Sequence, residues 1–387
     1  MKARSDQHVL ADLGIARFKP AQAAAHRMLT DAIAYHRSTA RSTDDSSSCL
    51  VTLPTSSGKD LLACSIARAF SGTVIVFHPY KALTAAADAY ASQFHCSAAV
   101  FSTNFVNDCC VDVVVAAYEQ AHDALIAFCA SLHRRGRLVA IIYNEAHVAL
   151  PHVDGRFRDF LSRDFLSINE LAPVLRHACQ FPLVFVCCTA TLQTQHLKLL
   201  PETLCMPSFS SVCRASPMRS NLAFSLRVVQ NWDQLLLALV AAVVAAPLRV
   251  IVFVPAVHYC SVLTGTLSDI GRPVFSYHAG LADDVKAQTL RDFSSLPSVL
   301  VTTTALSCGM NVADVSDVII FAQCFSTETL LQSGGRAARH GDSGRVVFLT
   351  SPHYIDKMSQ SDSYGSHQVL SLIHAPRFTD ALKQPYK

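Results

Sequence analysis

A short segment, LPTSSGKD at residues 53–60, has the residue types of a loop that binds phosphate groups. It stands between an apolar run, CLVTL, and a helical pattern, LLACSIARAF, which is the setting that such a loop requires. Gly58 lets the backbone approach a phosphate, while Lys59 and the N–H groups at the helix start supply positive charge. The candidate phosphate-binding residues are Thr55, Ser56, Ser57, Gly58, Lys59 and Asp60.

The same segment departs from the common phosphate-loop pattern at two positions. Pro54 stands where a first glycine is usual, and Asp60 stands where a hydroxyl-bearing residue usually contacts Mg²⁺. A proline turn followed by a helix with a solvated lysine therefore explains this segment alone equally well.

A second group of polar residues, Asn144, Glu145 and His147, directly follows the apolar run LVAIIY. An acidic side chain at the carboxyl end of a parallel strand is where nucleotide hydrolases hold magnesium and activate water. Glu145 is the candidate general base, and His147 is expected to couple the site to its surroundings. Asp60, Asn144 and Glu145 are the candidate Mg²⁺ ligands. A strand that ends in a polar turn is common, so this segment is not decisive by itself.

A third group lies in QSGGRAARHG at residues 332–341, where Arg336 and Arg339 are three positions apart. On a helix this spacing places both on one face. A planar guanidinium can stabilise the charge that develops during phosphoryl transfer, whereas an exposed arginine pair is the simpler alternative. Gln332 and the paired glycines before Arg336 favour the functional interpretation.

The elements that would position these residues are short apolar runs separated by helical stretches. The runs are continuous rather than alternating, so they predict parallel strands covered on both faces, in a doubly wound α/β arrangement. They occupy residues 73–78, 111–118, 137–144 and 182–189, and then 249–255, 274–280, 298–306, 317–324 and 344–351.

The chain divides by composition into four parts. We expect a first domain at residues 1–200, a linker at 201–222 with three prolines and many serines, a second domain at 223–352, and a weakly patterned tail at 353–387. The apolar run that begins at Leu235 is interrupted by Pro247 and is shorter than the ~20 residues that a bilayer requires, so we expect a buried helix followed by a strand and no membrane span.

Composition limits the possible partners and the compartment. The net charge of the 387 residues is only +3, so any nucleic-acid binding must come from local grooves rather than bulk charge. The 14 cysteines form no CxxC pair, so no zinc site is expected. Apolar surroundings of several cysteines and a polar N-terminus favour a reducing compartment, the nucleus or the cytoplasm.

Taken in order, these segments resemble the motifs of superfamily 2 helicases, and they look most like the RecQ family of DNA helicases. The segments are LPTSSGKD, NEAH, CTATL, YHAGL, TTTALSCGMNVADVSDVII and QSGGRAARHG, preceded by FKPAQ at Phe18–Gln22, which resembles the adenine-reading motif. The match spans about residues 10–350. It implies two tandem RecA-like P-loop NTPase domains with parallel sheets flanked by helices, with ATP and Mg²⁺ as cofactors.

The resemblance also implies an activity. It is that of an ATP-dependent DNA helicase or translocase that moves 3′ to 5′ on single-stranded or partly duplex DNA. Phe18, Gln22 and His147 would help to bind the nucleotide, and Gln332, Arg336 and Arg339 would act on its phosphates. Nucleic acid would contact Lys81, His278 and Thr303. A basic turn, HRRGR at residues 133–137, is expected to be a solvated turn at the opposite edge of the sheet.

Several positions depart from the family pattern, and two alternatives therefore stay open. The family has a hydroxyl-bearing residue at position 60 and an aspartate at position 144, whereas this chain has Asp60 and Asn144, so the number of carboxylates near the expected metal is unchanged. Ala313 replaces an acidic residue, and the loop at residues 147–160 lacks tryptophan. Asp60 either compensates for Asn144 or repels the phosphates. The alternatives are an impaired pseudo-helicase that binds nucleic acid and an RNA helicase of the same superfamily.

Overall fold

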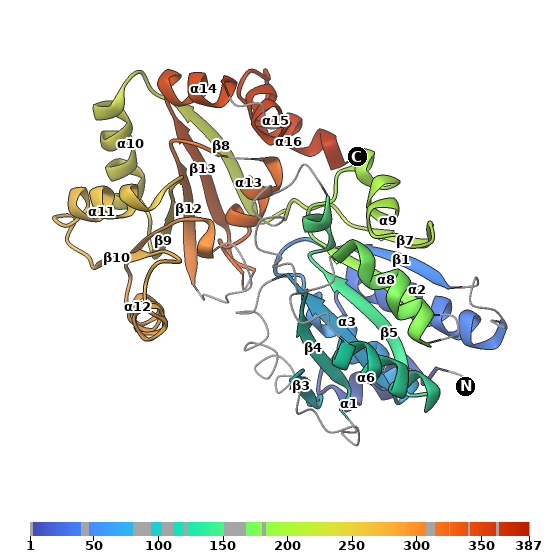
Figure 1. Cartoon of the computed structure of the whole chain (residues 1–387). Helices are drawn as coiled ribbons and strands as arrows, with labels where there is room; N and C mark the ends of the chain where they lie inside the picture. Colours follow the sequence, from blue (N-terminus) through green and yellow to red (C-terminus); the bar gives the residue numbers. More distant parts are fainter. Residues whose placement is uncertain are drawn as a thin grey trace. The chain divides into compact units, whose positions relative to one another are not determined.

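The computed structural model describes residues 3–39, 46–79, 94–102, 111–118, 123–150, 168–179, 183–306, 314–324, 326–339, 341–360 and 364–386 (Figure 1). The chain forms two compact units, Met1–Ser216 and Pro217–Lys387. Each unit is a parallel sheet with helices on both faces, so the predicted fold class is confirmed.

The first unit contains a seven-stranded parallel sheet in the order β3-β4-β2-β5-β6-β1-β7. Central strands are buried on both faces, which explains their unbroken apolar sequences. The strands are β1 (Ser47–Thr52), β2 (Thr73–His78), β3 (Ala98–Val100), β4 (Val113–Ala117), β5 (Leu138–Asn144), β6 (Val184–Thr189) and β7 (Phe209–Arg214).

Helices cover both faces of this first sheet. Ile141 and Tyr143 of β5 pack with α6 and α8, whereas Ile142 points to the opposite face and packs with α1, α2 and α3. The helices are α1 (Asp6–Asp12), α2 (Pro20–Thr39), α3 (Asp60–Phe70), α6 (Asp123–Arg134), α8 (Ile168–Cys179) and α9 (Leu199–Thr203), with short 3₁₀ turns η3 (Ala146–Ala149) and η4 (Thr194–His196).

The second unit contains a six-stranded parallel sheet in the order β10-β11-β9-β12-β13-β8. The strands are β8 (Leu222–Val228), β9 (Arg249–Phe253), β10 (Val274–Tyr277), β11 (Val299–Thr302), β12 (Val315–Phe321) and β13 (Gly344–Thr350). Helices α10 (Trp232–Val244) and α11 (Val257–Thr266) pack on one face, and α12 (Asp283–Ser295) and α13 (Thr327–Gly334) pack on the other.

The apolar run that begins at Leu235 forms α10 and β9, as the sequence predicts. The helix buries Leu235 and Leu239, while Leu237 is exposed, so it is half-buried rather than enclosed. Among the described residues, no helix combines the length and the apolar character that crossing a bilayer would require.

Residues 201–222, which the sequence suggested as a linker, are largely structured. They include the end of α9 and the strand β7, which pairs in parallel with β1 at the edge of the first sheet. The burial of β7 alternates over its first four residues, with Ser210 and Val212 exposed, so it lacks the continuous apolar run of a central strand. The division between units falls at Ser216 and Pro217 instead.

The segment at residues 353–387, expected as a weakly ordered tail, forms helices of the second unit. These are α14 (Pro352–Ser359), α15 (Tyr364–Ile373), α16 (Phe378–Lys383) and the 3₁₀ turn η6 (Gln384–Tyr386). Another 3₁₀ turn of this unit, η5 (Thr304–Leu306), follows β11. Met358, Leu372 and Leu382 are buried in the core beneath the sheet. The helices are short and their apolar positions are few, so the sequence pattern was weak.

We expect the substitution Leu382→Ala to destabilise the second unit by about 2–5 kcal/mol, because it removes a fully buried side chain of α16. Trp232, the chain's single tryptophan, packs against Phe321 of the same unit and reports its unfolding by fluorescence. The exposed neighbour gives the control Lys383→Ala, which should leave the urea midpoint unchanged. Equal midpoints for both variants would contradict the packing of α16.

Candidate functional site

The predicted phosphate loop lies between β1 and α3, as the sequence indicates. Ser56 and Gly58 have positive φ values of 60° and 76°, and the N–H of Ser57 donates to the Pro54 carbonyl at 3.2 Å. These torsions fold the chain tightly before α3, whose first residue is Asp60. The N–H groups of Gly58 and Lys59 make no backbone hydrogen bond within the described part of the chain, so the loop offers donors for an anion.

Gln22 of α2 holds this loop in place. Its amide nitrogen donates to the carbonyl oxygens of Ser57 at 2.6 Å and Gly58 at 3.3 Å, and its oxygen accepts from the Lys19 N–H at 2.8 Å. A Cβ atom on Gly58 would lie 2.6 Å from the Gln22 amide nitrogen. A larger residue at position 58 would therefore displace the end of the Gln22 side chain, and the positive φ independently favours glycine. Phe18, also in the predicted adenine-reading motif, is buried next to His26.

Glu145 faces Lys59 across the carboxyl edge of the sheet. The Lys59 Nζ lies 3.8 Å from Glu145 Oε1, and both side chains are mostly buried. Glu145 follows β5 with φ 51° and ψ 41°, in the left-handed region that non-glycine residues seldom adopt. A strained backbone of this kind persists only where the surrounding structure enforces it, and such residues concentrate at functional sites.

His147 lies beside Glu145 and is held by Thr189 of the neighbouring strand β6. The Nδ1 atom of His147 lies 3.4 Å from Glu145 Oε2 and 2.8 Å from the Thr189 hydroxyl. Thr189 ends β6 and belongs to the CTATL segment. The structure thus links the NEAH and CTATL segments, which the sequence associated only by their order.

Asn144 is fixed by two hydrogen bonds, one of them to a residue that sequence reasoning missed. Its side-chain oxygen accepts from the Glu145 N–H at 3.1 Å, and its side-chain nitrogen donates to His78 Nδ1 at 3.1 Å. Burial lowers the pKa of His78 to about 4, against an opposing effect of Glu145, so this imidazole is neutral at pH 7. The sequence signal for His78 was its place at the end of an apolar run. It is the last residue of β2, which pairs with β5, so it lies at the same sheet edge as Asn144.

The residues at this edge fit a nucleotide triphosphate and magnesium. The loop supplies N–H donors and Lys59 for phosphates, and Asp60 and Glu145 supply two carboxylates. Magnesium in such sites is usually held by one or two carboxylates together with phosphate oxygens. Among the described residues, no cluster of three or more His, Cys, Asp and Glu side chains could hold a metal without such help.

In the second unit, Arg336 and Arg339 do not lie on a helix, so the expected shared helical face is wrong. Helix α13 ends at Gly334, and Ala338 has a φ of 47°. Glycines have low helix propensity, and the N–H of Ala338 donates to the Val315 carbonyl at 2.7 Å, which draws the chain toward β12. Both arginines therefore lie in a turn after α13, with Arg336 buried.

Arg219 secures this arginine turn and was also missed. Its guanidinium donates to the carbonyl oxygens of Gly335 at 3.3 Å, Ala337 at 2.8 Å and Ala338. The side-chain nitrogen of Asn221 donates to the Ala338 carbonyl at 3.1 Å. These residues lie in the stretch that the sequence suggested as a linker, so no local motif marked them. Gln332 lies on α13, two residues before its end.

His278 and Thr303, two predicted nucleic-acid contacts, are brought together at one sheet edge. Each follows the end of a strand, β10 or β11, and these strands pair with Tyr277 opposite Thr302. The N–H of Thr303 donates to the Tyr277 carbonyl at 3.4 Å. Lys81, Ala313 and most of the loop at residues 147–160 lie outside the described residues.

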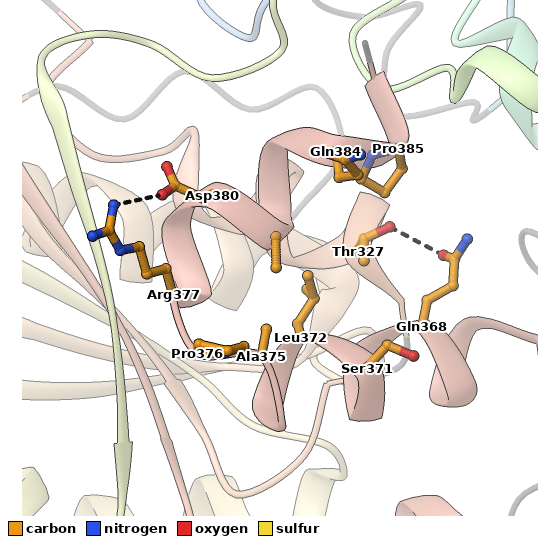
Figure 2. Close-up of a pocket in the computed structure, with 11 residues that line it drawn as sticks. Thr327, Gln368, Ser371, Leu372, Ala375, Pro376, Arg377, Asp380, Gln384 and Pro385 are labelled. Atoms are coloured by element: carbon orange, nitrogen blue, oxygen red, sulfur yellow. Dashed lines mark hydrogen bonds and ion pairs between the residues drawn. The ribbon is translucent and has the colours of Figure 1, made fainter.

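A pocket of about 590 Å³ lies in the second unit, and none of the predicted site residues lines it (Figure 2). It is bordered by α15, α16 and the first residue of α13, Thr327, whose hydroxyl donates to Gln368 Oε1 at 3.1 Å. Arg377 and Asp380 form an ion pair at its rim, 3.8 Å apart. The remaining lining is mainly apolar and contains no group suited to phosphate chemistry.

Sequence comparisons find a similarity to helicases in the second unit. Residues 233–341 match the model of the helicase conserved C-terminal domain. The ATP-dependent RNA helicase DBP7 of Yarrowia lipolytica is 33% identical over 101 residues, covering 24% of this chain and 13% of that protein. The ATP-dependent RNA helicase MAK5 of Coccidioides immitis is 25% identical over 150 residues, covering 38% and 19%. The matches span less than a fifth of these relatives' own length.

Structural comparisons extend over both units. The DEAD-box helicase Mss116 bound to single-stranded RNA has a TM-score of 0.68 at 15% identity, covering 94% of this chain and 76% of that one. The helicase MrfA bound to DNA has a TM-score of 0.64 at 16% identity, covering 90% and 52%. The chain has the fold of a helicase core with two tandem RecA-like domains. The RecQ type expected from the sequence is not supported by these relatives, whose names are those of RNA helicases.

We expect stability to fall in acid partly through His78. Its pKa is 6.5 in an unfolded chain and about 4 in the folded one, so the unfolded state binds more protons between these values. The histidine therefore lowers the free energy of unfolding as pH falls below about 6.5, by about 2 kcal/mol near pH 5. His78→Gln keeps an acceptor for Asn144. Its free energy of unfolding should therefore fall correspondingly less than that of the wild type between about pH 7 and pH 5.

Urea unfolding followed by circular dichroism measures this difference. The matched control His177→Gln removes an exposed histidine and should keep the wild-type pH dependence. The assignment to His78 is wrong if both variants lose as much stability as the wild type.

Proposed function

We propose that this chain is the core of an ATP-dependent RNA helicase or translocase. The observation that carries the proposal is the 3.8 Å approach of Lys59 and Glu145 beside a loop with unbonded N–H donors. This arrangement pairs a phosphate-binding cation with a candidate base at the carboxyl ends of parallel strands, where nucleotide hydrolases place them. The helicase C-terminal match in the second unit supports nucleic acid as the partner.

We propose RNA rather than DNA as the partner because the relatives with similar sequences are named RNA helicases. DBP7, PRP5 and MAK5 proteins, each named an ATP-dependent RNA helicase, are similar to part of this chain. The 3′ to 5′ DNA helicase of RecQ type that the motifs favoured is the competing proposal. Both use the same nucleotide site, so the nucleic acid must be distinguished by measurement.

The chain's own residues would act in the following way. The loop N–H groups and Lys59 bind the phosphates, and Gln22 keeps the loop in its binding conformation. Glu145, positioned by Asn144 and His147, takes the proton from the attacking water. ATP with Mg²⁺, held by Asp60 and Glu145, would supply the phosphoanhydride bond whose cleavage releases energy. Gln332, Arg336 and Arg339 of the second unit would stabilise negative charge on nucleotide phosphates.

We expect Glu145→Gln to reduce ATP turnover by about 100-fold or more, because it removes the base and keeps the side-chain shape. ATP hydrolysis is measured without nucleic acid, with single-stranded RNA and with single-stranded DNA of the same sequence. The wild type should be stimulated more by RNA than by DNA. Glu202→Gln, on α9 and away from the site, is the matched control and should keep wild-type turnover.

Three outcomes separate the candidates. Greater stimulation by DNA favours the RecQ-type proposal. Nucleic-acid binding without turnover in the wild type identifies a pseudo-helicase. Equal turnover in the wild type and Glu145→Gln refutes the assignment of the base.

Asp60 and Asn144 allow a separate prediction about the metal site. If Asp60 compensates for Asn144, Asp60→Thr lowers turnover and the double variant with Asn144→Asp restores it. The competing view is that Asp60 repels phosphate, since two like charges ~4 Å apart cost about 4 kcal/mol at an effective dielectric of ~20. Higher RNA-stimulated turnover in Asp60→Thr alone would therefore show that compensation is wrong.

A further inference from the structure

A cluster of basic side chains gathers at the amino edge of the first sheet, opposite the phosphate loop. Helices that connect parallel strands run antiparallel to them, so α2, α6 and α8 all end at this edge. We call the cluster the basic edge. It comprises Arg37, His133, Arg134, Arg135, Arg137, Arg176 and His177.

Contacts between these elements show that the basic edge is one surface. The Arg37 guanidinium donates to the Leu138 carbonyl at 3.0 Å, which places the end of α2 beside the first residue of β5. Burial lowers the pKa of His133, with further effects from Arg37 and His36, so the end of α6 lies close to the end of α2. Helices α6 and α8 pack together on one face of the sheet (Figure 1).

Stabilisation at the carboxyl ends of helices explains only some of the basic side chains at this edge. A basic side chain near the carboxyl end of a helix is stabilised by the helix dipole, and Arg37 also bonds a carbonyl group. In contrast, Arg134, Arg137 and Arg176 make no side-chain hydrogen bond or ion pair with any described residue. The Nε atom of Arg176 is buried, so these three guanidinium groups keep their other donors for another molecule.

Among the residues that the structure describes at this edge, acidic side chains do not neutralise the cluster. Asp123 and Glu170 lie in the first turns of α6 and α8, at the opposite ends of these helices. Asp112 lies at the amino end of β4, but it is paired with Arg68 at 3.1 Å and bonded to Ser97. The described part of this edge is therefore strongly positive, although the whole chain carries a net charge of only +3.

We propose that the basic edge binds the phosphodiester backbone of nucleic acid, as a second contact separate from the nucleotide site. Guanidinium groups bind phosphate oxygens through paired hydrogen bonds without reading sequence. The proposal takes its class of partner from the proposed function and adds a surface that acts without ATP. Only the HRRGR turn was visible in the sequence, because Arg37 and Arg176 join it through folding.

The test compares two variants that remove equal charge. The basic-edge variant is Arg134→Gln, Arg137→Gln and Arg176→Gln, and the control is Arg27→Gln, Arg227→Gln and Arg377→Gln, which are exposed elsewhere. Binding of labelled RNA and DNA, single-stranded and duplex, is measured by fluorescence anisotropy without nucleotide over a range of KCl concentrations. Circular dichroism confirms that each variant is folded.

We expect the basic-edge variant to bind about 10-fold or more weakly and the control to bind as the wild type does. The slope of log affinity against log salt should fall by about 2, because three phosphate contacts are lost. ATP hydrolysis without nucleic acid should be unchanged. Weaker binding of RNA alone assigns the edge to RNA, and weaker binding of all probes assigns it to any phosphate backbone.

Other outcomes overturn the proposal. Unchanged affinity and salt slope in the basic-edge variant exclude nucleic acid, as does an equal loss in the control. Labelled poly-glutamate is titrated in the same assay as a further probe, and if the variant loses only the binding of poly-glutamate, the edge serves an acidic protein instead. A failure of the proposed function is distinct, since it would appear as absent RNA-stimulated hydrolysis in the wild type whatever the basic-edge variant does.

Discussion

The parallel direction of the strands is the constraint on which the candidate site depends. Residues that follow β1, β2, β5 and β6 all emerge at one edge, and the ladder fixes their register, with Val51 and Asn144 both opposite Cys188. Lys59 and Glu145 are therefore neighbours although they are far apart in the chain. Because these strands are buried on both faces, the same apolar contacts that stabilise the sheet also hold the polar residues at its edge.

Glu145 shows how this support is used. Its left-handed backbone conformation costs on the order of 1–3 kcal/mol, and the Asn144 side chain accepts its N–H. The carboxylate thereby turns back toward Lys59 instead of continuing the line of the strand. His147, held by Thr189, lies beside the second carboxylate oxygen of Glu145, the one that does not face Lys59. A fixed carboxylate of this kind needs little rearrangement to accept a proton, which is an advantage in a hydrolytic site.

Central strands and the phosphate loop could be predicted from sequence because their signals are local. Continuous apolar runs indicate double-sided burial, and Gly58 with Lys59 marks the loop. The edge strand β7 and the helices after Pro352 carry weaker patterns, since a half-exposed element needs few apolar residues. The arginine turn was predicted as a helix from spacing alone. Its true conformation depends on Arg219, more than a hundred residues earlier, and no local pattern reports such a contact.

The presence of an amide at position 144 is explained better by its hydrogen bond with His78 than by the loss of an aspartate. An amide carries both a donor and an acceptor, and both are used, toward His78 and toward the Glu145 N–H. His78 is buried and neutral, so its Nδ1 lone pair needs a donor that a carboxylate lacks. Asn144→Asp would require the ring to move its proton to Nδ1. Asn144 and neutral His78 therefore form a matched pair, and the second carboxylate for a metal can come from Asp60 at the start of α3.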